Sequence, residues 1–119
     1  MKSFFNFALV GLLAASMGSC AKKDQNIIKG NITYIGAVTG SSFVGAGATV
    51  GLYTSQTSTT AISTTTADAS GNYRFSPVLD GTWWVYAALE DDFGTFYDSQ
   101  LSIFVEKEDI GTVNLVLRN

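Results

Sequence analysis

Apolar and polar residues alternate along much of the chain beyond residue 27, which is the pattern of half-buried β-strands. The first such segment, Ile28 to Ile35, places Ile28, Ile32 and Tyr34 on one face. Six further segments have the same β-branched and aromatic character: 48–53, 62–67, 72–76, 82–89, 101–106 and 113–117. No stretch keeps the period of an amphipathic helix, and a chain of this length can bury one two-layer core without disulfides. The pattern therefore predicts an antiparallel β-sandwich of seven strands.

The clearest local signal is a hairpin turn between the third and fourth of these segments. A threonine-rich run, Thr64 to Thr66, enters the turn at Asp68 and leaves it through Gly71 and Asn72, after which aromatic residues alternate. An Asp side chain that caps its own turn, followed by a glycine with positive φ, explains this stretch better than a calcium loop does. The later acidic ligands of a calcium loop are missing.

Other segments indicate where strands lie in the sheets. The segment 62–67 is thinly apolar and is expected near a sheet edge. The segment 82–89 is apolar on both faces, which is typical of a strand in the middle of a sheet. Pro77 has no N–H to give to a β-ladder and is expected to end its strand. Residues 36–47 are small and glycine-rich, which predicts a mobile connection more readily than a binding loop.

The start of the chain has the composition of a secretory leader. Lys2 supplies a positive charge, and the apolar run from Phe4 to Met17 is shorter than the roughly 20 residues that a membrane-spanning helix needs. We therefore expect residues 1–19 to be a cleaved signal helix.

The leader ends at the only cysteine of the chain. Residues 17–21, Met-Gly-Ser-Cys-Ala, resemble the lipobox of bacterial lipoproteins, with Met17 where leucine is usual. The resemblance implies that Cys20 carries the lipid, that residues 20–27 form a polar tether, and that residues 28–119 form the sandwich domain. Ala21 directly after the cysteine implies an outer membrane lipoprotein, on the periplasmic face or the cell surface. The alternative is an ordinary signal peptide, with Cys20 incidental; it leaves the unpaired cysteine of an exported chain without an explanation.

Charge and composition argue against several classes of function. Without residues 1–19 the chain keeps six basic against ten acidic side chains, because only Lys2 is removed, and a net charge of −4 argues against nucleic acid as a partner. The absence of histidine excludes a Ser-His-Asp triad and histidine metal sites. Glu90, Asp91 and Asp92 are better explained as a solvated acidic loop than as a catalytic pair, although weak calcium binding there stays open. We expect no enzyme activity and no cofactor.

Four short motifs stand in a recognisable order: Gly30-Asn31-Ile32-Thr33-Tyr34, Gly45 to Leu52, Ala67 to Phe75, and Gly81 to Val85. Together they resemble the carboxypeptidase regulatory-like domain, with Ala67 where threonine is usual and Trp83 where tyrosine is usual. The resemblance implies a transthyretin-like (prealbumin-like) sandwich of Ig-like architecture. It also implies a domain without catalytic residues of its own.

Aromatic residues are the candidate for binding. Trp84 and Tyr86 fall on the face of segment 82–89 opposite the expected core. The residues expected to border that face are Phe93, Phe96, Tyr97 and Phe104. Exposed aromatic rings can stack on sugars or anchor a protein partner, whereas the alternative is that they pack under a loop. We therefore expect a lipid-anchored envelope protein whose sandwich is a non-catalytic binding or structural module with a protein or glycan partner. The alternative function is a carbohydrate-binding accessory protein. The sequence carries no signal for an oligomeric state.

Overall fold

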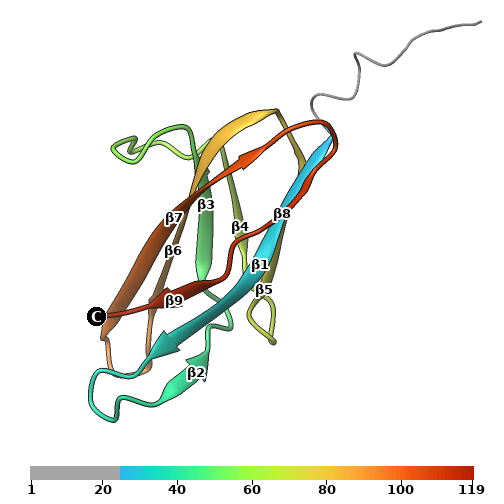
Figure 1. The fold of residues 1–119 in the computed structure, drawn as a ribbon. Helices are drawn as coiled ribbons and strands as arrows, with labels where there is room; N and C mark the ends of the chain where they lie inside the picture. Colours follow the sequence, from blue (N-terminus) through green and yellow to red (C-terminus); the bar gives the residue numbers. More distant parts are fainter. Residues whose placement is uncertain (1–24) are drawn as a thin grey trace, which may run out of the picture.

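Nine β-strands and no helix make up the part of the chain that the computed structural model describes, residues 25–119 (Figure 1). The strands are β1 (Asn26–Ile35), β2 (Ser42–Val44), β3 (Thr49–Tyr53), β4 (Ser63–Thr66), β5 (Asn72–Val78), β6 (Gly81–Glu90), β7 (Phe96–Val105), β8 (Ile110–Thr112) and β9 (Leu115–Leu117). They form two sheets that pack face to face, which confirms the predicted all-β sandwich. Residues 25–119 include no helix that is long and apolar enough to span a membrane.

Strand β1 is the centre of the first sheet. Its first half pairs with β5 on one edge and with β8 on the other, and its second half pairs with β2 and β9. The pairs with β5 and β2 are antiparallel, whereas those with β8 and β9 are parallel. Ile28 and Ile32, on the face predicted to be apolar, have no exposed surface. This one strand therefore organises both the sheet and its half of the core.

The second sheet has the strand order β4-β3-β6-β7. Strand β6 lies inside it and β4 at its edge, so both predicted positions are confirmed. Val85 and Ala87 on β6 are fully buried, and Trp83 is nearly so. The indole N–H of Trp83 donates a hydrogen bond of 3.0 Å to the Leu79 carbonyl, which satisfies its polar atom inside the core.

The prediction of seven strands is wrong by two. Strand β2 lies within the predicted loop 36–47, and β8 precedes the last predicted strand. Both have three residues, too few for an alternating pattern to be visible, and they form because the edges of β1 offer backbone partners there. The first strand also begins at Asn26, two residues before the expected domain boundary at Ile28.

Pro77 does not end its strand, contrary to the prediction. Strand β5 continues to Val78, and the register with β1 shifts between Ile28 and Asn26. Ser76 and Pro77 therefore lie in a bulge, and β5 is an edge strand whose other side has no ladder. A residue without an N–H is tolerated at such a position because no ladder hydrogen bond is lost.

Between β8 and β9 the chain passes close to the backbone of β1 at Gly30. The Val113 N–H donates to the Lys29 carbonyl at 2.8 Å, and the Asn31 N–H donates to the Asn114 side-chain oxygen at 2.9 Å. The hydroxyl of Tyr73 donates to the Val113 carbonyl at 2.5 Å, and burial raises the pKa of Tyr73 well above its usual value. The segment thus lies directly against β1, at the position where β1 has no side chain.

Candidate binding sites

The turn between β6 and β7 is built in the same way as the predicted hairpin turn. Asp91 Oδ1 accepts hydrogen bonds from the N–H groups of Phe93 and Thr95, both at 2.9 Å, and Gly94 has a φ of 83°. Phe93 occupies the outermost position of this turn and is 93% exposed. The turn therefore holds a large apolar ring in solvent on a backbone that hydrogen bonds keep in place.

The predicted turn from Asp68 to Asn72 shows the same geometry and is confirmed. Asp68 Oδ1 accepts from the N–H groups of Ser70 and Asn72, both at 2.9 Å, and Gly71 has a φ of 83°. The carboxylate closes the turn on its own backbone.

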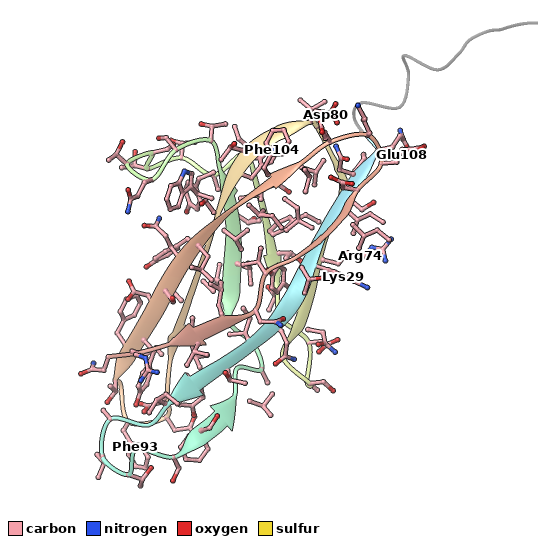
Figure 2. The ribbon with its side chains drawn as sticks, in the orientation of Figure 1. Lys29, Arg74, Asp80, Phe93, Phe104 and Glu108 are labelled. Atoms are coloured by element: carbon pink, nitrogen blue, oxygen red, sulfur yellow. The ribbon has the colours of Figure 1, made fainter. Side chains whose placement is uncertain are left out.

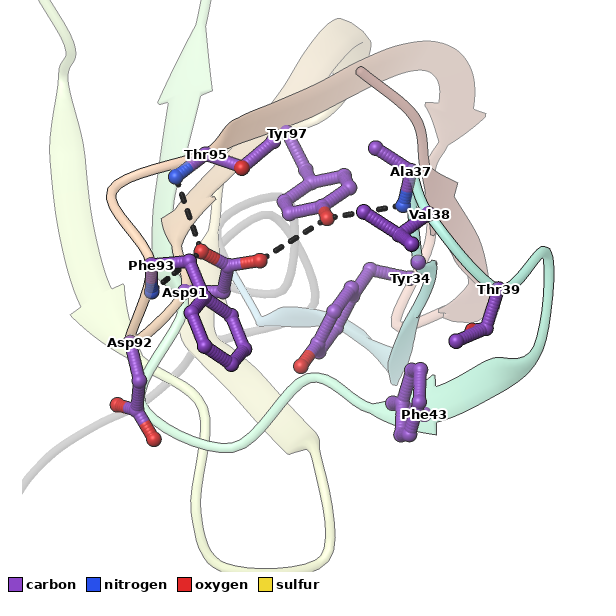
Figure 3. A pocket seen from close by; sticks show the side chains of 11 residues that line it. Tyr34, Ala37, Val38, Thr39, Phe43, Asp91, Asp92, Phe93, Thr95 and Tyr97 are labelled. Atoms are coloured by element: carbon purple, nitrogen blue, oxygen red, sulfur yellow. Dashed lines mark hydrogen bonds between the residues drawn. The ribbon is translucent and has the colours of Figure 1, made fainter.

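Asp91 also joins this turn to the loop between β1 and β2. The hydroxyl of Tyr97 donates to Asp91 Oδ2 at 3.0 Å and accepts from the Ala37 N–H at 3.1 Å (Figure 3). The hydrogen bond from the Thr95 N–H, with those from Phe93 and Tyr97, holds the pKa of Asp91 below its usual value against the opposing effect of desolvation. The carboxyl group is therefore ionised at neutral pH and ties two loops together.

A pocket of about 220 Å³ lies between these two loops, and we call it the distal pocket. Aromatic side chains form much of its lining: Tyr34, Phe43, Phe93 and Tyr97. The Tyr34 ring stacks on Phe43 at a centroid distance of 5.3 Å and leans on Tyr97 at 4.9 Å. Tyr97 is buried, and Val38 on the opposite rim is 97% exposed. The pocket thus has a packed aromatic wall and a rim of exposed apolar groups.

The distal pocket lies at the end of the sandwich remote from residue 25. Strand β1 starts near Asp80 and Glu108 and runs to the end where Phe93 lies (Figure 2). Ten residues of strand span about 33 Å at ~3.3 Å per residue. The start of the described chain and the pocket are therefore separated by the length of the domain.

A second hollow, of about 260 Å³, lies on the outer face of the second sheet, and we call it the outer hollow. It is lined by Tyr53, Gln56, Ser58, Tyr86 and Gln100. The rings of Tyr53 and Tyr86 meet edge to face with centroids 6.3 Å apart. Among residues 25–119, no hydrogen bond is made by the side-chain amides of Gln56 and Gln100. The hollow therefore combines apolar ring surface with polar groups free to bind a ligand.

Tyr86 is held in place by a neighbour on β7. Its hydroxyl donates to Asp98 Oδ2 at 2.9 Å. Burial, together with this hydrogen bond and the charge of Asp98, raises the pKa of Tyr86 to about 12. The side chain is a neutral phenol at physiological pH, with its ring turned toward the hollow rather than free to rotate.

The structure separates the three aromatic residues that the sequence suggested as a site. Tyr86 lines the outer hollow, and Trp84 lies on the same face, directly opposite Tyr53 in the β3–β6 pair. Phe104 pairs with Thr82 further along the sheet, is 59% exposed and does not line the hollow. Cys20 lies outside the described residues.

Sequence reasoning missed the distal pocket. By sequence pattern Tyr34 belongs to the apolar face of the first strand and Phe43 to a mobile loop. The same patterns place Asp91 in a solvated acidic loop, and Phe93 and Tyr97 at the border of the aromatic face of segment 82–89. One signal was available: the Asp-x-x-Gly pattern of the predicted turn recurs at Asp91 and Gly94. A second turn of the same kind would have placed Phe93 at an exposed tip.

Metal binding has no support in the described part of the chain. Among residues 25–119, no three Cys, Asp or Glu side chains come together as a metal site would require. The carboxylates of Asp68 and Asp91 are both engaged by the N–H groups of their own turns.

Solved structures with the same arrangement of strands come from bacterial proteins. One is PA1324 of Pseudomonas aeruginosa, for which carbohydrate binding has been suggested, with a TM-score of 0.58, 14% identity, and coverage of 80% of this chain and 90% of that one. This chain has the sandwich fold of these bacterial proteins. GBS52, the minor pilin of Streptococcus agalactiae, matches with a TM-score of 0.57 and 16% identity over 92% of this chain. BcpA, the major pilin of Bacillus cereus, matches with a TM-score of 0.54 and 14% identity over 80% of this chain.

The shared feature is the fold alone, because the sequence identities are low. This chain spans 50% of the minor pilin and 30% of the major pilin. No protein-family model matches the sequence, and neither does any curated protein. The Ig-like, prealbumin-type sandwich that the motifs implied is thus found in the structure, while the narrower family resemblance stays a sequence-based inference.

Proposed function

We propose that this protein is an outer membrane lipoprotein anchored through Cys20, with a sandwich of the carboxypeptidase regulatory-like kind that acts as a non-catalytic binding module. The observation that carries the proposal is the position of the distal pocket, at the opposite end of β1 from the tether. A domain attached in this way holds its pocket away from the membrane, facing the compartment in which a ligand or partner is found.

The groups around the pocket support binding rather than catalysis. The Asp91 carboxylate accepts three hydrogen bonds, from Phe93, Thr95 and Tyr97, so it is committed to holding the loops together. The chain has no histidine to act as a general base at neutral pH. The pocket offers a ligand aromatic surface, and burying that surface against the ligand contributes to binding.

The lipid anchor is tested by replacing Cys20 with alanine. Two or three acyl chains hold a protein firmly on a bilayer, so we expect the wild-type protein in the membrane fraction and nearly all of the Cys20→Ala protein in the soluble fraction. A Lys29→Ala protein, changed at an exposed position of β1, serves as the matched control. A Cys20→Ala protein that stays with the membranes after a high-salt wash would show that the lipid assignment is wrong. Protease treatment of intact cells then distinguishes the cell surface from the periplasmic face.

A second candidate function, carbohydrate binding, is favoured by the outer hollow. Sugar rings present C–H faces that stack on aromatic rings, and their hydroxyl groups bond to amides. Tyr53 and Tyr86 supply the rings, and Gln56 and Gln100 supply the amides. The alternative that we drew from the sequence is thus retained with a changed set of residues: Tyr86 is central, Trp84 is adjacent, and Phe104 serves as a control.

A glycan array tests this second candidate. If the outer hollow is the site, a Tyr86→Ala protein should bind its best glycan about tenfold or more weakly, because a stacking surface is lost from the middle of the hollow. Trp84→Ala should have a smaller effect and Phe104→Ala none. If the wild-type protein binds no glycan of a broad panel above background, carbohydrate binding is ruled out and the first proposal is unaffected.

A further inference from the structure

We propose that the distal pocket binds a small quaternary ammonium ion, that is, an organic cation without N–H groups. The inference rests on the proposed binding function and names the class of ligand. It follows from three features of the pocket: its ring surfaces, its charge and the hydrogen bonds that Asp91 and Tyr97 already make.

The ring surfaces have the arrangement that attracts a cation. Figure 3 shows the side chains of Phe93, Tyr34 and Phe43 gathered with Asp91 around the pocket. A cation within about 6 Å of an aromatic face is attracted by the negative charge density of the ring. The hydrogen bonds that Asp91 Oδ1 accepts from the Phe93 and Thr95 N–H groups hold the turn on which the Phe93 ring is exposed to solvent.

The charged side chains that line the pocket are all acidic. Asp91 and Asp92 both line it, and a Cβ on Gly94 would lie 3.6 Å from a carboxylate oxygen of Glu90. No lysine or arginine is among the lining residues. The local field therefore favours a cation over an anion or a neutral ligand.

Part of the hydrogen-bond acceptor capacity around the pocket is already used within the protein. A carboxylate has about four acceptor positions, and Asp91 uses three of them within the protein. The Tyr97 hydroxyl both donates and accepts already. Asp92 and the Tyr34 hydroxyl remain as acceptors for a primary ammonium or a guanidinium, which must exchange its hydrogen bonds to water for them. A methylated ammonium has no such hydrogen bonds to lose and gains the aromatic surface, so it is favoured.

Size and position favour a free small molecule. A volume of about 220 Å³ corresponds to about seven water molecules at about 30 Å³ each, enough for a trimethylammonium group. The pocket opens at the end of the domain opposite the tether, which keeps it away from the lipids of the membrane that holds the anchor.

Choline, ethanolamine and 3,3-dimethylbutan-1-ol together test the inference. The first two differ only in methylation of the ammonium group, and the alcohol has the shape of choline without its charge. Calorimetric titration of the detergent-solubilised full chain should show choline binding about tenfold more tightly than either analogue. Amide NMR shifts should be confined to residues 34–43 and 91–97.

Single substitutions test whether choline binds in the distal pocket. Phe93→Ala should weaken choline binding about tenfold without affecting folding, because the ring is 93% exposed, and Asp92→Asn should weaken it several-fold. Phe104→Ala, which removes an exposed ring far from the pocket, should change nothing. Equal binding of choline and the alcohol, tighter binding of ethanolamine, or no binding at all would each overturn the inference. The Cys20→Ala fractionation is unaffected by these results, so failure of the cation site is distinguishable from failure of the lipid anchor.

Discussion

A Gly30→Ala protein is expected to lose about 3 kcal/mol or more of its free energy of unfolding. An added Cβ at this position would lie 1.8 Å from the carbonyl oxygen of Val113 and 2.9 Å from the Tyr73 hydroxyl. Neither neighbour can move cheaply, because the Val113 N–H is bonded to Lys29 and its carbonyl accepts from Tyr73. Relief requires the segment between β8 and β9 to leave β1, which breaks the parallel pairing along one edge of the central strand.

Urea denaturation of Gly30→Ala beside Lys29→Ala measures this effect. Lys29 is the neighbouring residue with an exposed side chain, so its replacement should change the free energy of unfolding by no more than about 0.5 kcal/mol. The total free energy of unfolding of a domain of this size is about 5 to 15 kcal/mol. The urea midpoint of the Gly30 variant should therefore lie far below that of the wild type. Equal midpoints for the two variants would mean that the segment between β8 and β9 does not lie this close to Gly30.

An Asn26→Ala protein is expected to lose about 3 kcal/mol, although the change removes only a small polar side chain. Asn26 has no exposed surface. Its amide group donates to the Val78 carbonyl at 3.0 Å and to Asp80 Oδ1 at 2.7 Å, while its oxygen accepts from the Asp109 N–H at 2.9 Å. Alanine leaves these partners without the polar atoms to which they are bonded, and a buried group without its hydrogen bond costs about 1 to 3 kcal/mol.

Asn26→Asp separates hydrogen bonding from volume. The aspartate keeps the shape of asparagine and can accept from Asp109, but it places a second carboxylate beside Asp80. We expect it to be at least as destabilised as Asn26→Ala at neutral pH and to recover in acid, when a proton can bridge the two carboxyl groups. An Asn26→Ala protein as stable as the wild type would show that these hydrogen bonds are replaced by water at no cost.

Local signals in the sequence predicted the strands and one turn well. Segment 82–89, apolar on both faces, was predicted to lie inside a sheet, and β6 has β3 on one edge and β7 on the other. Asp68 and Gly71 predicted their turn because the hydrogen bonds and the positive φ that form it lie within five residues. Where the signal was non-local the prediction failed: β2 and β8 exist only because β1 has free edges beside them.

The distal pocket depended on pairing that no local pattern reveals. Tyr34 and Phe43 come together through the β1–β2 ladder, and Tyr97 reaches them from a different sheet. The hydrogen bond between the Ala37 N–H and the Tyr97 hydroxyl joins residues 60 positions apart in the sequence. Tyr86 could be assigned to the outer face from alternation alone, but its neighbours Gln56 and Gln100 could not.

The sequence by itself determined the all-β class, the faces of the long strands, the Asp68 turn and the absence of histidine chemistry, because each depends on residue type or on spacing within a few positions. The tertiary structure alone decided the strand order, the close approach at Gly30, the burial of Asn26 and the two hollows. Those features depend on which distant segments share an edge of β1 or an end of the sandwich. The free energy of such contacts comes from surfaces that meet only when the whole chain is folded.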